Sequence, residues 1–348
     1  MKIVHLIFDF NVGGTETMLV DIVNEQSKCN DVTIVIINDC YDSTLIASIS
    51  QRVHIKFIHR QPKSRNPLYF AYLNLWLSLK KPDIVHYHNY VTPKVLLPIF
   101  KLFSTVHALG IPPTYFKRCK CLFAISESVR NDILSHGEYP VSVVPNGIDV
   151  ERISPRSINR LRLPFRIVQI ARLEDAIKGQ DILIKGIGYL KRKGISNVEL
   201  DLIGEGESLT SLKSLANKEQ VGDVVHFLGK KSRDFIYSHL CGYDLMCHPS
   251  RTEGFGLTVA EGMAAKVPVL VPDSDGPYDI IGHGKHGQVF KKNDIDDFCH
   301  RLMHIYENYD QIFTPEAIAE AYTHVLNNYS LQRMVKCYSQ VYGSFLDN

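Results

Sequence analysis

Glu253 and Glu261 frame the part of the sequence in which residue types and spacing most clearly indicate chemistry. Gly254 and Gly256 lie between them, a compact helical run begins at Leu257, and a short strand-like run follows over residues 267–272. Glycines just before a helix let the backbone approach a ligand closely, and the free N–H groups there favour an anion. The pattern therefore predicts a ligand with a phosphate on backbone N–H groups and hydroxyls on carboxylates. An ordinary helix start with two solvated glutamates fits this segment equally well.

A second pair of glycines, Gly13 and Gly14, follows the first expected strand and precedes an expected helix over residues 15–28. This arrangement indicates another anion site at a helix start. The segment lacks the G-x-G-x-x-G pattern, so a dinucleotide-binding fingerprint is not supported. A plain turn is the common explanation for two glycines in a loop.

Two cationic side chains, Arg172 and Lys178, follow an expected strand over residues 165–171. Arginine offers a bidentate fork to phosphate oxygens, and lysine offers a point charge. In a reaction that releases a diphosphate, fixed cations are most effective where the leaving charge develops. Isolated arginines and lysines are normally solvated, so the position of this pair after a strand is what makes it a candidate.

One histidine, His107, ends an expected strand over residues 104–107. A single histidine at a strand end is more often structural than catalytic. His86 and His88 lie on the preceding expected strand, and for His88-Asn89 at its end an acceptor-side role stays open.

Strand-like runs alternate with helical patterns along the chain, which is typical of parallel sheets built from βαβ units. Expected strands span residues 3–8, 32–37, 54–58, 83–88, 104–107, 121–126 and 141–145. The stretch 149–164 contains prolines and several arginines but little apolar periodicity, and is interpreted as a linker. A second series spans residues 165–171, 198–203, 224–228, 244–248 and 267–271, followed by helical patterns over 294–309, 315–327 and 331–345. Two doubly wound α/β domains are predicted, with ligands beyond the carboxyl ends of the strands.

The composition excludes several classes of protein. The 348 residues suffice for two hydrophobic cores, and 45% hydrophobic with 22% charged residues is typical of a globular protein. A net charge of +2 gives no indication of nucleic-acid binding. Eight cysteines without zinc-type spacing, and no signal peptide before the first strand, predict reduced thiols in a cytoplasmic protein. The longest apolar stretch, residues 68–79, is too short to span a bilayer.

The two glutamates, embedded as Glu-Gly-Phe-Gly and Glu-Gly-Met-Ala, resemble the Glu-x7-Glu motif of retaining GT-B glycosyltransferases of family 4. The resemblance covers nearly the whole chain and is strongest in its second half. It implies two Rossmann-like domains that face a cleft, with the acceptor on the first and the nucleotide sugar on the second. The expected boundaries are residues 1–150 for the acceptor domain, 151–164 for the linker, 165–329 for the donor domain and 330–348 for a C-terminal helix that packs back on the first domain.

The same resemblance implies roles for the residues at matching positions. His107 is expected beside the reacting centre, Arg172 and Lys178 on the diphosphate, and Glu253 on hydroxyls of the donor sugar. Glu261 matches the glutamate that binds the ribose. The remaining donor-binding residues, expected to act mainly through their backbone, are Gly14, Gly229, Gly254, Phe255, Gly256 and Leu257.

Two features depart from the family pattern. Four residues separate Leu173 from Lys178, where three is frequent, so this loop is expected to bulge. Asp279 stands where many relatives have a glutamate, and its side chain is shorter. No Asp-x-Asp with a supporting carboxylate occurs in the segments expected at the cleft, so we expect no metal and no cofactor besides the nucleotide sugar.

The resemblance, together with the residues above, implies a retaining, metal-independent glycosyltransferase of bacterial cell-surface polysaccharide synthesis, such as capsule or lipopolysaccharide. The expected donor is a UDP-sugar and the expected acceptor is a hydroxyl of a glycan or lipid-linked oligosaccharide. GDP-mannose-dependent mannosyl transfer is the second choice. A sugar-nucleotide epimerase, a glycoside phosphorylase and a catalytically weak nucleotide-sugar-binding partner subunit are the further alternatives.

Aromatic, apolar and basic residues gather in one part of the first half of the chain. They occupy residues 66–81, 95–103 and 115–120. Interfacial helices have this composition, and so do ordinary core-facing helices, which are commoner. Peripheral contact with the inner face of the cytoplasmic membrane is therefore an additional hypothesis.

Overall fold

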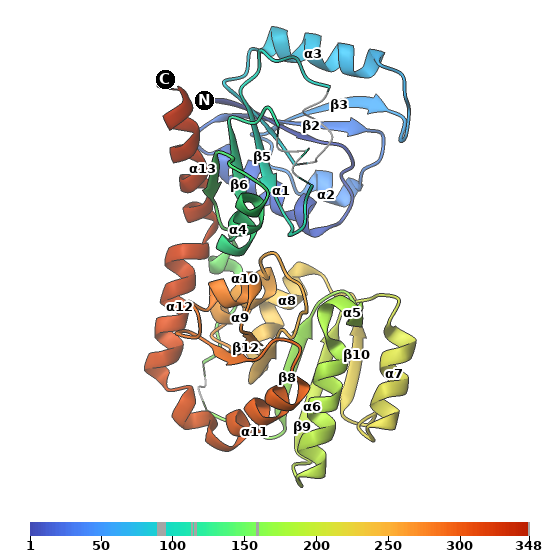
Figure 1. Ribbon diagram of the computed structural model, residues 1–348, viewed down its shortest axis with the longest axis vertical. Helices are drawn as coiled ribbons and strands as arrows, with labels where there is room; N and C mark the ends of the chain where they lie inside the picture. Colours follow the sequence, from blue (N-terminus) through green and yellow to red (C-terminus); the bar gives the residue numbers. More distant parts are fainter. Residues whose placement is uncertain (89–94, 113, 115–116, 158–159, 347–348) are drawn as a thin grey trace. The chain divides into compact units, whose positions relative to one another are not determined.

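The computed structural model describes residues 1–88, 95–112, 114, 117–157 and 160–346. The chain divides into two compact units, one formed by residues 1–147 together with 331–348 and the other by residues 148–330. Each unit is built around a parallel β-sheet that carries helices (Figure 1). The predicted α/β class with two doubly wound domains is confirmed.

The first unit contains a seven-stranded sheet in the order β3-β2-β1-β4-β5-β6-β7. All residues of β1 after Lys2 are buried, which is typical of a parallel strand covered on both faces. The order reverses between β1 and β4, where Ile3 pairs with both Val32 and Ile84. The strands are β1 (Lys2–Ile7), β2 (Asp31–Asn38), β3 (His54–Arg60), β4 (Ile84–Tyr87), β5 (Leu102–Val106), β6 (Cys121–Ala124) and β7 (Val141–Val143).

The C-terminal helix belongs to the first unit, although the chain reaches it only after the second. It lies beside α1, and its Tyr338 and Tyr342 are fully buried against the edge of the Phe123 ring. The helices of this unit are α1 (Gly14–Gln26), α2 (Ser43–Ala47), α3 (Leu68–Lys80), α4 (Glu127–Ser135) and α13 (Leu331–Leu346).

The second unit contains a six-stranded sheet in the order β10-β9-β8-β11-β12-β13. Its strands are β8 (Phe165–Ile170), β9 (Val198–Ile203), β10 (Val225–Gly229), β11 (Leu245–Cys247), β12 (Val269–Pro272) and β13 (Gln288–Phe290). Sequence analysis missed the edge strand β13, because it has three residues and only Phe290 among them is buried.

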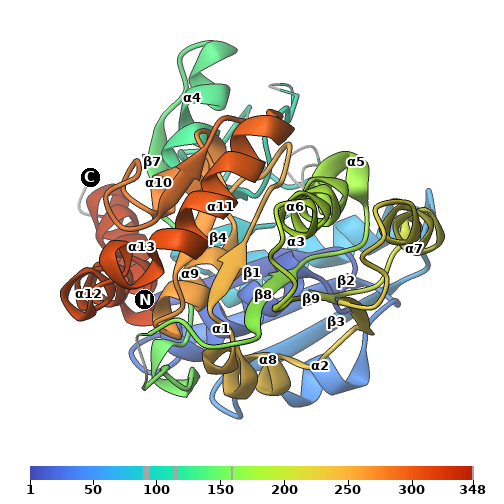
Figure 2. The same ribbon diagram turned by 90° about the horizontal axis from the view of Figure 1, so that it is seen from below.

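Helix α6 lies between α7 and α11 (Figure 2). A side chain at Gly186 of α6 would clash with Phe298 of α11, since an added Cβ would lie 2.6 Å from its ring. The helices of this unit are α5 (Asp175–Lys178), α6 (Gln180–Arg192), α7 (Leu209–Lys218), α8 (Arg233–His239), α9 (Leu257–Ala264), α10 (Asp275–Ile280), α11 (Ile295–Ile312) and α12 (Pro315–Tyr329), with 3-10 turns η3 (Val150–Arg152) and η4 (Leu240–Gly242).

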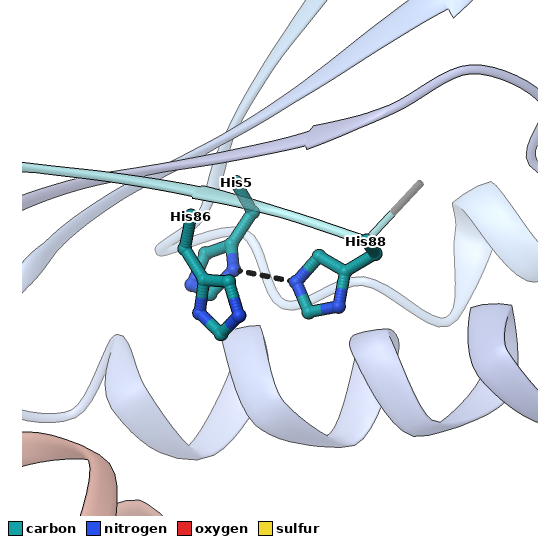
Figure 3. Close-up of side chains that lie close together, drawn as sticks. All are labelled: His5, His86 and His88. Carbon is teal, nitrogen blue, oxygen red and sulfur yellow. Dashed lines mark hydrogen bonds between the residues drawn. The ribbon is translucent and has the colours of Figure 1, made fainter. Parts of the chain in front are cut away.

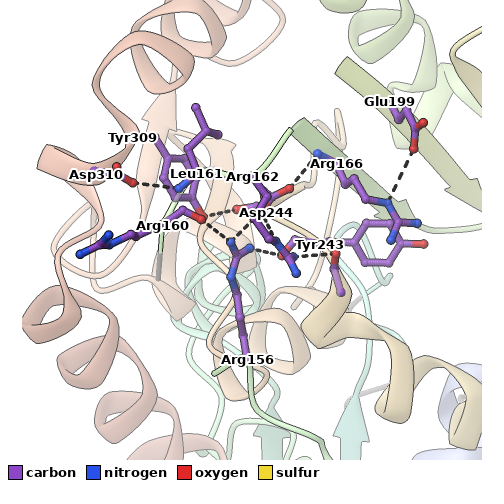
Figure 4. A network of polar contacts seen from close by, with 11 residues as sticks. Arg156, Arg160, Leu161, Arg162, Arg166, Glu199, Tyr243, Asp244, Tyr309 and Asp310 are labelled. Carbon is purple, nitrogen blue, oxygen red and sulfur yellow. Dashed lines mark hydrogen bonds and ion pairs between the residues drawn. The ribbon is translucent and has the colours of Figure 1, made fainter. Parts of the chain in front are cut away.

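The described part of the expected linker lies in the second unit and is fixed there by a buried ion pair (Figure 4). Arg156 is only 4% exposed and donates to Asp244 Oδ1 at 2.6 Å. Arg162 donates to the same oxygen at 3.1 Å, and the backbone N–H of Arg166 donates to Asp244 Oδ2 at 2.9 Å. Buried charges are tolerated when they are paired and hydrogen-bonded in this way. The arginines that suggest a solvated linker in the sequence therefore anchor this stretch.

Candidate active site

The candidate site of the second unit forms where β8 and β11 end. Lys178 ends the short helix α5, which takes up the extra residue after Leu173, and Gly179 connects α5 to α6 with φ +69°. An added Cβ on Gly179 would lie 2.2 Å from the carbonyl oxygen of Pro249, in the loop after β11. Only glycine allows both this conformation and this close approach. The sequence thereby brings the α5 turn against the segment that carries Glu253.

Lys178 and Glu253 form an ion pair at the centre of the site. The Lys178 Nζ atom lies 2.6 Å from Glu253 Oε2, and both side chains are about four-fifths buried, with 18% and 20% exposed. His248 Nε2 lies 3.2 Å from the same carboxylate oxygen and 3.1 Å from Ser250 Oγ. Thr258 Oγ1 lies 3.3 Å from the other ring nitrogen of His248. The two partners of Glu253 thus contact Oε2 and leave Oε1 for a ligand hydroxyl.

The carboxylate of Glu253 is held in its charged form. Burial by itself would raise its pKa, but the hydrogen bond and charge of His248 and the charge of Lys178 outweigh burial and lower the pKa to about 2. A carboxylate that stays ionised can only accept hydrogen bonds. This property suits binding of sugar hydroxyls rather than proton donation.

A second ion pair, which sequence analysis missed, fixes the same loop to α6. Arg251 donates to both carboxylate oxygens of Asp181 at 2.9 Å, and its backbone N–H donates to Ile177 O at 2.7 Å. The bidentate geometry sets orientation as well as distance. Burial raises the pKa of Asp181, but Arg251 and Lys185 more than compensate and lower it overall.

The start of α9 provides the expected anion-binding backbone. Gly256 precedes the helix with φ +99°, and no side chain caps the first turn. The Val259 N–H donates to Gly256 O at 2.9 Å, and the first N–H groups of a helix otherwise lack a partner within the helix, which suits them to a phosphate. An added Cβ on Gly276 of α10 would lie 2.4 Å from Phe255 Cα, so this second glycine, also missed, lets α10 support the loop. Phe255 itself is 3% exposed and packs edge-on against Tyr329, which leaves only its backbone for a ligand.

The other predicted residues of this unit lie around this centre. Glu261 is in α9, whereas Glu253 lies in the loop before this helix, and Glu261 is 8% exposed. The Arg172 side chain is 73% exposed and pairs with Glu174 at 3.7 Å, so it extends into solvent. Gly229 ends β10 with φ +67°, and its carbonyl accepts from Gly204 N at 3.0 Å. The shorter Asp279 contacts His283 at 3.2 Å.

Gly14 and His107 belong to the first unit. Gly14 is the first residue of α1, and an added Cβ there would meet no atom within 4 Å, so the backbone is open to a ligand. His107 directly follows β5, and burial lowers its pKa to about 4. Its Nε2 atom is buried without a hydrogen-bond partner among the described residues. Asn89, noted in the sequence beside His88, lies outside these residues.

Together, the second unit offers a lysine, an ionised glutamate and the uncapped start of a helix within one loop cluster. A lysine and helix N–H groups bind phosphate, whereas a carboxylate binds hydroxyls. Among the described residues, three side chains with metal-ligating atoms close together occur at His5, His86 and His88 of the first unit. The groups gathered in the second unit are therefore suited to bind a sugar phosphate ester.

Comparison with known proteins agrees with this chemistry. Residues 155–325 match the family described as Glycosyl transferases group 1, and residues 12–152 match Glycosyltransferase Family 4. A GDP-mannose-dependent alpha-(1-6)-phosphatidylinositol monomannoside mannosyltransferase of Mycobacterium tuberculosis is 30% identical over 44% of this chain and 43% of its own length. A putative colanic acid biosynthesis glycosyltransferase of Salmonella typhimurium is 27% identical over 54% of this chain and 48% of its own length. The chain thus aligns with less than half of the length of each of these two curated relatives.

Solved structures share the whole fold. The Anabaena protein HepE, in complex with UDP and glucose, aligns with 99% of this chain and all of its own at a TM-score of 0.82 and 18% identity. The apo lipopolysaccharide outer core galactosyltransferase WaaB aligns over the same shares at a TM-score of 0.76 and 18% identity. These identities establish the fold alone. The family matches over both halves, together with this fold, show that the chain belongs to the family 4, group 1 glycosyltransferases of the GT-B fold.

Proposed function

We propose that this protein transfers a sugar from a nucleotide sugar to a hydroxyl group of a growing bacterial cell-surface glycan. The observation that carries the proposal is the Lys178–Glu253 pair beside the uncapped start of α9. In the proposed complex, the diphosphate lies on the first turn of α9, with Lys178 and Arg172 as its cations. Glu253 Oε1 accepts from a hydroxyl of the donor sugar, and Glu261 accepts from the ribose.

The proposed reaction retains the configuration of the donor sugar. The bond between the anomeric carbon and the phosphate oxygen breaks, and its electrons pass to the diphosphate, where the cations and the α9 start stabilise the new charge. The acceptor oxygen then bonds to the anomeric carbon on the same face. Its proton passes to the departing phosphate oxygen, so no enzyme carboxylate acts as a nucleophile. The family resemblance implies that His107 lies beside the reacting centre.

Hydrolysis of the donor without acceptor tests this assignment. Lys178→Ala removes the cation proposed for the diphosphate and leaves Glu253 with His248 as its remaining partner, so we expect hydrolysis to fall about 100-fold. Lys191→Ala is the matched control, since Lys191 pairs with the exposed Asp223 at 3.3 Å and does not contact the site. Equal rates in the two variants would refute the role of Lys178, and no hydrolysis by the native protein would favour a nucleotide-sugar-binding subunit.

The first choice of donor is a UDP-sugar. GDP-mannose is a second candidate, because the 30% identical mycobacterial relative is described as GDP-mannose-dependent. We also propose that the reaction needs no metal, since Lys178, Arg172 and the α9 start together supply positive charge for the diphosphate. Full activity after dialysis against EDTA supports this point, and activity restored only by Mg²⁺ or Mn²⁺ contradicts it.

We further propose that the protein contacts the cytoplasmic membrane face through α3. Leu68, Tyr72, Leu75 and Leu79 recur at helical spacing and are 69%, 45%, 60% and 74% exposed, so α3 carries an apolar stripe in addition to its buried face. None of the described helices is long and apolar enough to cross a bilayer. The stripe therefore suits contact with a surface, as in interfacial helices.

The charge of the surrounding sequence complements an anionic lipid surface. Asp83 is the sole acidic residue between Asp42 and Glu127, whereas the basic residues there are Arg52, Lys56, Arg60, Lys63, Arg65, Lys80, Lys81, Lys94, Lys101, Lys117, Arg118 and Lys120. Since the whole chain has a net charge of only +2, the remainder is acidic overall. Of the basic and aromatic run 115–120, residues 115 and 116 lie outside the described residues.

Flotation with vesicles tests the membrane contact. We expect the protein to float with phosphatidylserine-containing vesicles at low salt and to lose this association in Leu75→Glu and Leu79→Glu variants. Leu326→Glu, at a 40% exposed leucine of α12, is the control. A protein that stays at the bottom of the gradient, or floats equally in all variants, would refute the contact.

A further inference from the structure

Four histidines of the first unit lie on one face of its sheet. His5 of β1 pairs with His86 of β4, and His86 pairs with Phe103 of β5. Paired residues on neighbouring strands project to the same side, and so do residues two apart. His88 therefore follows His86 on this face, and Thr105 and His107 follow Phe103.

Hydrogen bonds connect two of these histidines, His5 and His88, with each other and with Gln26 of α1; Figure 3 shows the bond between the two rings. His5 Nε2 lies 2.8 Å from Gln26 Oε1, at the end of α1. His5 Nδ1 lies 3.0 Å from His88 Nε2. The series of hydrogen bonds ends there, because His88 Nδ1 is buried without a hydrogen-bond partner among the described residues. His107 has an equally buried Nε2 atom without a partner, and the two rings are 5.8 Å apart between centroids with a tilt of 35°.

The partner atoms determine where the protons lie. The structure turns the amide oxygen of Gln26 toward His5, and a carbonyl oxygen only accepts, so in this orientation of the amide His5 carries its proton on Nε2 and donates to Gln26. Neutral His5 then has a bare Nδ1, which accepts the Nε2–H of His88. Neutral His88 in turn has a bare Nδ1, so it offers an acceptor in the direction of β5. All three imidazoles are neutral, since burial lowers the pKa of each.

A metal site is the alternative interpretation of this cluster, since ligating atoms of His5, His86 and His88 lie within 4.8 Å of one another. The His86 ring, however, stacks on that of His88 at 4.4 Å and 23°, so their in-plane lone pairs do not converge. Both nitrogens of His86 are already engaged, with Tyr342 at 2.6 Å and with Thr105 at 2.8 Å. His86 is therefore a packing partner held by α13 and β5.

We propose that His88 is a positioning residue for His107. The bare Nδ1 of His88 accepts the Nε2–H of His107 through one water, and so keeps the Nδ1 atom of His107 unprotonated. Gln26 and His5 set this state by fixing the tautomer of His88. We call this series, Gln26, His5, His88 and His107, the relay. Its effect on catalysis rests on the proposed function, in which His107 lies at the reacting centre. The tautomer of His107 does not depend on that function.

Nitrogen NMR of the imidazoles in the full-length protein tests the relay, with His88→Gln and His107→Gln spectra for assignment. The native protein is expected to show His107 as the Nε2–H tautomer. His88→Asn keeps an acceptor at the place of Nδ1 and should preserve that state. His88→Gln keeps only the donor toward His5 and should give a mixture of tautomers. Should a His88 variant not fold, Gln26→Met, which removes the acceptor at the far end, is expected to give the same mixture.

Kinetics supply the second readout. We expect His88→Gln to lower kcat about tenfold with KM unchanged, and His88→Asn to restore most of the loss, because a wrong tautomer impairs the reacting state rather than binding. A native His107 in the Nδ1–H form, or an Nε2–H form unchanged in His88→Gln, would overturn the relay. Zn²⁺ that shifts the His5, His86 and His88 signals together would overturn it in favour of a metal site. Should the native protein transfer no sugar, the proposed function fails and the NMR result still decides the relay.

Discussion

The two units carry their candidate polar groups at the same point of their sheet topologies. Strand order reverses between β1 and β4 in the first sheet and between β8 and β11 in the second. His5 and His86 lie on the first of these strand pairs, and Lys178 and Glu253 follow the second. In doubly wound sheets such reversal points open a crevice for ligands. The chemistry at these two equivalent points nevertheless differs.

The second unit gathers charges, whereas the first gathers neutral rings. Lys178 and Glu253 form an ion pair whose side chains keep 18% and 20% of their surface exposed, so each can exchange its partner for a phosphate or a hydroxyl. His5 and His88 are buried, and their pKa values are lowered by burial, so they exchange hydrogen bonds but no charge. The same sheet topology therefore supports two different kinds of site. A charged site can bind a charged donor, and a neutral one can fix the direction of a hydrogen bond.

The largest effect is expected from the buried ion pair of the second unit. Asp244→Asn leaves Arg156 without a counter-ion in a site where the aspartate is fully buried, so we expect a loss of about 3–5 kcal/mol in the free energy of unfolding. Urea unfolding followed by circular dichroism measures it. Asp223→Asn, at an exposed partner of Lys191, should leave the free energy of unfolding nearly unchanged. Similar losses in both variants would contradict the contrast between buried and exposed charges.

The next effect concerns the charged site itself. Glu253→Gln keeps the shape but removes the charge that pairs with Lys178, and we expect kcat/KM for the donor to fall about 10²–10³-fold. Glu207→Gln, at an exposed glutamate before α7, is the matched control. A Glu253→Gln enzyme with native kcat/KM would show that the ionised carboxylate is dispensable.

Acid is expected to lower the stability of the first unit more than that of the second. The pKa of His5 and of His107 is about 4 in the folded protein, against about 6.5 when unfolded, so the unfolded chain binds more protons between these values. Stability is therefore fully present above pH 6.5 and falls toward pH 4, by about 2 kcal/mol for each histidine at pH 5. Glu253, with a pKa of about 2, contributes above its unfolded value of 4.5 and loses this contribution only as the pH falls toward 2.

The single tryptophan makes this difference measurable, because Trp76 lies in α3 of the first unit. Between pH 7 and pH 5, we expect the urea midpoint from tryptophan fluorescence to fall more than the midpoint of a circular-dichroism transition assigned to the second unit. Equal shifts of both midpoints would contradict the assignment of neutral histidines to the first unit.

The smallest effect is expected at the start of α9. Gly256→Ala places a side chain at φ +99°, with its Cβ 3.1 Å from Pro277, and should cost about 1–2 kcal/mol in stability. Gly343→Ala, where an added Cβ meets no atom within 4 Å, serves as the control and should be neutral or slightly stabilising. A neutral Gly256→Ala would show that the loop before α9 does not require this backbone conformation.

Sequence alone predicts much of the fold because each buried parallel strand is a continuous apolar run between helical patterns. Glu253, Lys178 and Gly256 can also be predicted, since a family motif or a glycine before a helix marks them. Arg251 and Asp181 cannot, because their pairing joins residues 70 positions apart and neither lies in a motif. His248 gives no signal as a lone histidine at a strand end, and Arg156 resembles a solvated linker residue until Asp244 is placed beside it.

The most direct test of the central claim is a thermal-shift panel of UDP, GDP, ADP and their common sugars. A ligand that binds the charged site of the folded protein raises Tm, by about 5 °C or more at 100 times its Kd. We predict that UDP-sugars raise Tm of the native protein and do so much less with Lys178→Ala. A response to GDP-mannose alone would keep the site and change the donor. No response to any nucleotide, or an undiminished response in the variant, would contradict the assignment of this site.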